Sequence, residues 1–226
     1  MIAARVAAVF AVVFVGSSVG AVGAAQAAPG ACAAGDPLRP TAELFATDNT
    51  ETITDPADHR LRNRLEGFEL AVDAIAVRNV ALPVGSTLVS GVFWSQERHH
   101  ATYERSREFH LACVDGADLG RIAQQVRARF GQESVLTFEH RAAGAPGIDA
   151  FIVEVADIDL RRFHDALVAD PVARERLVGG SVTEQNTLIL VADIADLEPT
   201  RRFVERVGGT WDFVTVRYGD REFVGA

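Results

Sequence analysis

The feature that most constrains the fold is an alternation of strand-like and helix-like segments that runs through the same order twice. In the first half, Asp55 and Pro56 are residue types that begin a helix, and apolar residues then recur at spacings of three and four as far as Ile75. A second helix is predicted to begin near Asp118 and to end at Gly131. Strand-like runs surround these helices at residues 42–46, 86–94, 107–114 and 134–140.

The second half repeats this order. Its strands are predicted at residues 151–156, 181–185, 187–192 and 211–217, its helices at residues 160–169, 171–177 and 197–207, and a final hairpin at residues 218–224. The order β-α-β-β-α-β is typical of the ferredoxin-like fold. The sequence therefore predicts an α+β protein of two tandem ferredoxin-like domains, residues 41–140 and 148–226, joined by a Gly- and Pro-containing linker at residues 141–147. We expect their open sheet faces to pack together as a pseudo-dimer.

The N-terminus has the three parts of a secretory signal peptide. Arg5 supplies the positive charge, residues 6–15 are apolar, and Ala25-Gln26-Ala27 provides the small residues of a cleavage site. This apolar run is shorter than the roughly 20 residues that a membrane-spanning helix needs, and no later segment is long and apolar enough. The sequence predicts that residues 1–27 are removed, that residues 28–40 form an N-terminal segment, and that the mature protein is soluble and secreted or otherwise extracytoplasmic.

The charge balance disfavours several classes of partner and reaction. The chain has 31 acidic and 22 basic residues, and its net charge of −9 becomes −10 when the signal is removed with Arg5. An acidic protein is a poor match for nucleic acid or for an anionic membrane surface. Every basic residue is arginine, which excludes Schiff-base lysines, P-loop lysines and Ser–Lys pairs. Because the common nucleotide, hydrolase and zinc-protease motifs are also missing, the sequence predicts no cofactor.

Two cysteines, Cys32 and Cys113, remain after the predicted cleavage. In an exported protein an even number of cysteines favours a disulfide, so we predict a Cys32–Cys113 bond. Lipidation of Cys32 is the alternative, although the preceding Pro29-Gly30-Ala31 lacks the leucine-type residue usual before a lipidated cysteine.

Four segments of the first half resemble one bacterial family. They are Glu43-Leu44-Phe45, Gly85-Ser86-Thr87-Leu88-Val89, Glu104-Arg105-Ser106 and, as the strongest match, Arg129-Phe130-Gly131-Gln132-Glu133-Ser134-Val135-Leu136. The family is a group of small exported proteins known only as a domain of unknown function, and the resemblance covers about residues 41–140. The resemblance implies that the protein is exported and that this region has the fold of the family's domain. It identifies no catalytic residue.

Three residues are candidates for a ligand pocket. In the predicted strand 107–114, His110 points away from the apolar face formed by Phe109 and Leu111. Trp94 and Tyr103 flank the same hairpin, and a His, a Trp and a Tyr on one sheet surface are suited to line a ligand site. The alternative is a packing surface between the two domains, in which His110 is only a hydrogen-bonded core residue.

Two other groups of polar residues are better explained without a metal. Glu97, His99, His100 and Glu104 are expected in a loop between two strands, where side chains diverge into water. The acidic segment 48–55 lacks the spacing of a calcium loop, and its residues are suited to turns and helix caps. The sequence therefore predicts no metal site.

No set of residues in the sequence forms a recognised catalytic constellation. We therefore predict an exported binding or interaction module whose partner is an unknown small molecule or an envelope protein. The alternative hypothesis is a small-molecule enzyme that uses a cavity between paired sheets, as dimeric α/β-barrel proteins do.

Overall fold

The computed structural model describes residues 38–47, 52–62 and 65–225, and the predicted signal peptide lies outside them. The first half contains β1 (Ala42–Ala46), the 3-10 helix η1 (His59–Arg62), α1 (Glu66–Arg78), β2 (Leu82–Ser95), β3 (His100–Ala112), α2 (Gly116–Phe130) and β4 (Val135–Arg141). The second half contains β5 (Ala150–Val155), α3 (Leu160–Ala169), α4 (Pro171–Arg176), β6 (Gly179–Thr183), β7 (Leu188–Asp193), η2 (Ile194–Asp196), α5 (Leu197–Arg206), η3 (Trp211–Phe213) and β8 (Thr215–Val224).

The eight strands form one closed antiparallel barrel in the order β1-β3-β2-β6-β7-β5-β8-β4. The prediction of two tandem ferredoxin-like domains packed face to face is therefore wrong. The two halves join edge to edge, β2 with β6 and β4 with β8. An open sheet leaves a row of unpaired backbone groups at each edge, and closing the barrel pairs both rows.

The C-terminal strand makes much of this closure possible. β8 is one strand of ten residues that pairs with β4 along one side and with β5 along the other, and the predicted hairpin at residues 218–224 is wrong. Gly219 lies within the strand, where a Cβ atom would meet the backbone oxygen of Glu139 at 2.3 Å and the ring of Phe138 at 2.5 Å. The glycine therefore permits a close approach between β8 and β4, and it does not mark a turn.

The β2–β3 hairpin is longer than the sequence predicts. β3 begins at His100, so most of the polar segment expected as a loop is strand, and residues 96–99 alone make the tip. His99 has a positive φ of 55° in this turn. Every second residue of β3, including Glu104, Ser106, Glu108 and His110, faces the inside of the barrel, and the residues between them face outward.

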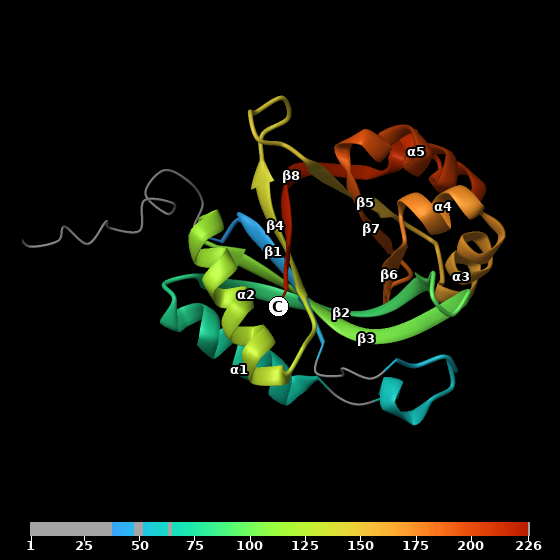
Figure 1. The fold of residues 1–226 in the computed structure, drawn as a ribbon. Coiled ribbons are helices and arrows are strands. Elements are labelled where there is room, and N and C mark those ends of the chain that lie inside the picture. Colours follow the sequence, from blue (N-terminus) through green and yellow to red (C-terminus); the bar gives the residue numbers. More distant parts are fainter. Residues whose placement is uncertain (1–37, 48–51, 63–64, 226) are drawn as a thin grey trace, which may run out of the picture.

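The helices lie on the outside of the barrel, with α1 and α2 on one side and α3, α4 and α5 on the other (Figure 1). The first helix begins at Glu66 rather than at Asp55, whose carboxylate instead accepts a bond from the backbone of Ala57 in a turn. Asp115, not Asp118, caps α2, and Gly131 ends that helix with a φ of 64°, as predicted. None of the helices in the described residues is long and apolar enough to cross a membrane.

The predicted disulfide joins Cys113 to Cys32, which lies outside the described residues. The Cys32–Cys113 bond therefore stays a prediction, and none of the described residues is a free cysteine.

Candidate functional site

The barrel interior is divided by an apolar middle layer. The layer consists of Val89, Phe138, Ala150, Ile152 and Ile189, all buried. On one side of it lies an open cavity, which we call the cavity end. On the other side lies a group of charged residues, which we call the acidic end. Both ends are built largely from the inward-facing residues of β1, β3, β4 and β8.

The cavity end holds a space of about 390 Å³. Its apolar walls are Phe45, Phe93, Leu136, Ile189, Val191 and Phe223, and its polar side chains include Glu104, Ser106 and Arg221. A volume of this size lies in the range of small-molecule sites, which are mostly apolar with a few polar groups that orient the ligand.

Glu104 is the carboxyl group of this cavity. It comes from β3, and Ser106, two residues further along the same inward face, donates its hydroxyl hydrogen to Glu104 Oε1. Burial raises the pKa of Glu104 above its ordinary value of 4.5, and the bond from Ser106 offsets part of this effect. Among the described residues, Glu104 makes no ion pair within 4.0 Å, so no guanidinium counters the effect of burial.

A second hollow of about 480 Å³ adjoins the cavity and shares Phe45, Phe93 and Glu104 with it. Gln132 lines this hollow, and its side chain accepts a bond from the backbone N–H of Thr47 at 3.3 Å and donates one to the backbone oxygen of the same residue. The junction between α2 and β4, residues 131–134, is thus tied to the end of β1. Glu104 lies where the two hollows meet.

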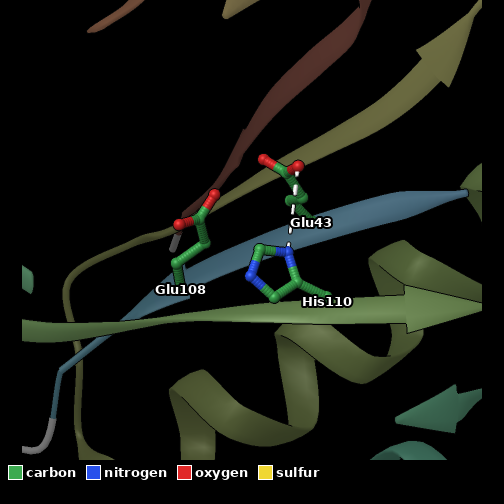
Figure 2. Close-up of side chains that lie close together, drawn as sticks. All are labelled: Glu43, Glu108 and His110. Atoms are coloured by element: carbon green, nitrogen blue, oxygen red, sulfur yellow. Dashed lines mark ion pairs between the residues drawn. The ribbon is translucent and has the colours of Figure 1, made fainter. Parts of the chain in front are cut away.

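The acidic end is centred on Glu43 of β1, whose side chain is 2% exposed. Its Oε1 atom lies 3.1 Å from His140 Nε2, 2.9 Å from Arg217 Nη2 and 3.9 Å from His110 Nδ1. Glu108 is also 2% exposed, and a carboxyl oxygen of each glutamate and a ring nitrogen of His110 lie within 4.8 Å of one another. Figure 2 shows these three side chains converging from β1 and β3.

The pKa values of the two glutamates are shifted in opposite directions. Burial acts to raise the pKa of Glu43, but the hydrogen bond from His140 and the charge of Arg217 outweigh it and leave the pKa lowered. Burial also raises the pKa of Glu108, where repulsion by Glu43 and a hydrogen bond with it add to the effect and carry the pKa well above 4.5. The pair is therefore expected to hold one proton, on Glu108.

Arg217 and His110 complete the acidic end. Arg217 Nη1 lies 2.6 Å from Glu154 Oε1, and the charges of Glu43 and Glu154 raise the pKa of the guanidinium although burial opposes them. Burial lowers the pKa of His110, and the charge of Glu43 only partly offsets this. The imidazole of His110 is therefore neutral at pH 7, with Nε2 3.3 Å from Thr87 Oγ1.

The structure separates the three predicted ligand residues. His110 faces the barrel interior, as the alternation of β3 predicts. Trp94 and Tyr103 face outward. The guanidinium carbon of Arg174 lies 4.4 Å from the centre of the Trp94 ring, and the rings of Tyr103 and His164 are stacked with their centres 5.8 Å apart. The three side chains do not line one pocket, and His110 alone belongs to the acidic end.

The polar residues that the sequence places in one loop lie in two different elements. Glu97 and His99 lie exposed in the hairpin tip, whereas His100 and Glu104 belong to β3. In the acidic segment predicted to form turns and caps, residues 48–51 lie outside the described residues.

The prediction of a binding or interaction module, which rested on the lack of a catalytic constellation, is wrong. The strands form one closed barrel with no interface between two sheets, and its interior brings together ionisable groups that lie far apart in the sequence. These groups are Glu43, Glu104, Glu108, His140 and Arg217. For part of this set the sequence does offer a signal, because polar residues occupy every second position of β3 from Thr102 to His110.

No protein-family model and no curated protein matches the chain. An anthrone oxidase-like protein of known structure is 13% identical over 82% of this chain and 92% of its own, with a TM-score of 0.25. A protein from Lactobacillus acidophilus NCFM, described as a candidate monooxygenase, is 12% identical over 83% of this chain and 96% of its own, also with a TM-score of 0.25. At these scores neither likeness supports a conclusion about fold or function.

Proposed function

We propose that this protein is an enzyme that moves a proton to or from carbon in a small, largely apolar molecule. The substrate lies in the cavity end of the barrel, and Glu104 is the acid–base residue. The observation that carries the proposal is a carboxyl group with a raised pKa, without an ion-pair partner among the described residues, on the wall of a cavity whose lining is mostly apolar.

The surroundings of Glu104 are suited to this chemistry. A carboxylate in an apolar site is a stronger base than one in water, because burial disfavours its charged form. Ser106 fixes one oxygen of the carboxyl group, which leaves the other oxygen to meet a substrate. The aromatic walls Phe45 and Phe93 offer flat contact surfaces, so a planar substrate with one acidic C–H bond fits the cavity best.

The test uses 5-nitrobenzisoxazole, a small planar carbon acid. When a base removes the proton on carbon 3, the N–O bond breaks and one coloured product forms, which carries both a nitrile and a phenolate. The reaction therefore needs only a base, and it is followed by absorbance. The full protein is expected to accelerate this reaction with saturation, and Glu104→Gln is expected to lower kcat/KM by about 10²- to 10⁴-fold. The chain has no lysine, so amine side chains contribute no background.

Two further variants make the result specific. Glu198→Gln makes the same chemical change on the outside of α5, where the side chain is 67% exposed, and is expected to keep the rate of the parent. Val191→Phe places an aromatic ring in the cavity and leaves Glu104 intact, and it is expected to raise KM or abolish saturation. A parent protein no faster than free acetate at the same pH, or a Glu104→Gln variant with the parent's rate, would contradict the proposal.

A further inference from the structure

The acidic end contains a group of charged residues that take no part in the proposed reaction. Three carboxylates, of Glu43, Glu108 and Glu154, converge there on one guanidinium, that of Arg217. With the proton expected on Glu108, two carboxylates face one arginine, and a bound cation would take the place of that proton.

Two glutamates at this end also have a carboxyl oxygen that no group among the described residues satisfies. Within the described residues, Glu43 Oε2 and Glu108 Oε1 are buried and accept no hydrogen bond, although both side chains are almost fully enclosed. His110 Nδ1 is 3.9 Å from Glu43 Oε1, which is beyond hydrogen-bond range. Buried polar atoms without partners are rare and costly, so these unsatisfied atoms call for a ligand.

We propose that Glu43, Glu108 and His110 bind one divalent transition-metal ion. Two carboxylate oxygens and one imidazole nitrogen are a donor set that suits Zn²⁺ or Mn²⁺ and that leaves positions on the ion for water or a small molecule. The converging side chains are those of Figure 2. The proposal goes beyond the reaction proposed for the cavity end, and it does not depend on it.

The neighbours of these three residues are placed as the partners of metal ligands usually are. Thr87 Oγ1 lies 3.3 Å from His110 Nε2, and a bond donated by that nitrogen leaves the lone pair on Nδ1, which faces the glutamates. His140 and Arg217 both contact Glu43 through Oε1, so Oε2 stays available. Arg217 keeps its second ion pair with Glu154, at 2.6 Å, when the ion takes over the charge of Glu43.

The test is a titration of the full, chelator-treated protein with Zn²⁺, in competition with a coloured chelator. One ion is expected to bind per chain. Glu108→Gln is expected to weaken binding by more than about 100-fold, because even a residue that only orients a ligand contributes about 10- to 100-fold. Thr87→Val is expected to fall within that smaller range.

Glu104→Gln is the matched control, since it makes the same change on the same face of β3, four residues away, and is expected to bind Zn²⁺ as the parent does. Loaded with Co²⁺, the parent is expected to show visible absorption bands that His110→Gln loses, which gives a second readout should Glu108→Gln fold poorly. Binding that Glu108→Gln retains, binding that depends on His99 of the hairpin tip, or a response to Mg²⁺ and Ca²⁺ alone would each overturn the proposal. None of these measurements uses turnover of 5-nitrobenzisoxazole, so the two proposals fail separately.

Discussion

The two ends of the barrel interior place glutamates from the same strand in opposite settings. At the cavity end, Glu104 faces an apolar space with one hydroxyl partner and no ion-pair partner among the described residues. At the acidic end, Glu108 lies in close packing with another carboxylate, two imidazoles and a guanidinium nearby. Burial raises the pKa of both groups, but Glu104 lines a cavity of about 390 Å³, whereas Glu108 is 2% exposed and lies among other charged side chains.

The largest expected effect comes from the arginine that balances the acidic end. Arg217→Met keeps the apolar stem but leaves Glu43, at 2% exposure, without its guanidinium. Removing one partner of a buried ion pair costs about 3–5 kcal/mol, because the remaining charge stays buried. The free energy of unfolding in urea, measured at neutral pH without added metal, is the test. A loss below about 1 kcal/mol would mean that the acidic end is more open to water than its burial indicates.

The middle layer is expected to give the next largest effect. Ile152 is fully buried between the two ends, so Ile152→Ala opens a cavity there and should cost about 2–5 kcal/mol of unfolding free energy. Ile152→Val, which removes one methyl group, should cost about 0.5–1.5 kcal/mol. Equal losses for the two substitutions would contradict a close-packed layer and would weaken the distinction between the ends.

The substitution Glu104→Gln is expected to change the free energy of unfolding by a smaller amount and in the opposite direction, by raising it. The raised pKa means that the folded protein binds this proton more tightly than the unfolded chain does, so stability falls as the pH rises through the folded pKa. Glu104→Gln removes this penalty and should be more stable than the parent at neutral pH. Thermal unfolding at several pH values tests this, and the gain should disappear below pH 4.5, where the parent carboxyl is protonated in both states. A variant less stable at neutral pH would point to an attractive partner of the carboxylate.

The same residue sets the pH dependence of the proposed reaction. Because the base is the carboxylate, kcat/KM for 5-nitrobenzisoxazole should rise with pH and level off above the raised pKa of Glu104. The midpoint of that rise should therefore lie above 4.5. A rate that is flat through this range would assign the base to another group.

Much of the local structure could be predicted from the sequence, whereas the assembly of the strands could not. Helical spacing correctly placed Phe68, Val72 and Ile75 on the buried face of α1. The pairings that close the barrel join residues about 90 positions apart, such as Ser90 with Val182, and no local pattern reports such a contact. A strand at the open edge of a sheet and a strand paired on both sides can have the same sequence pattern. The sequence therefore did not distinguish two open sheets from one closed barrel.

The candidate site was missed for a related reason. A polar segment between two strands usually forms a loop in contact with water, so the first part of β3 was predicted to be a loop. In the barrel, every second residue of this segment faces the interior, where Glu104 is half-buried and Glu108 is 2% exposed. Aromatic residues misled in the opposite direction, because Trp94 and Tyr103 pack under the helices and not around a ligand.

The smallest expected effect is the counterpart of the first. Arg221 lies on the same inward face of β8 as Arg217, four residues further on, and reaches the cavity end. Its partner Asp193, 2.7 Å away, is 50% exposed, so water screens the pair and stabilises the carboxylate when the arginine is removed. Arg221→Met is therefore expected to cost less than about 1 kcal/mol in the same urea experiment. If the two substitutions were equally costly, charge burial would not distinguish the ends, and the contrast between an open cavity and a closed acidic cluster would have to rest on shape alone.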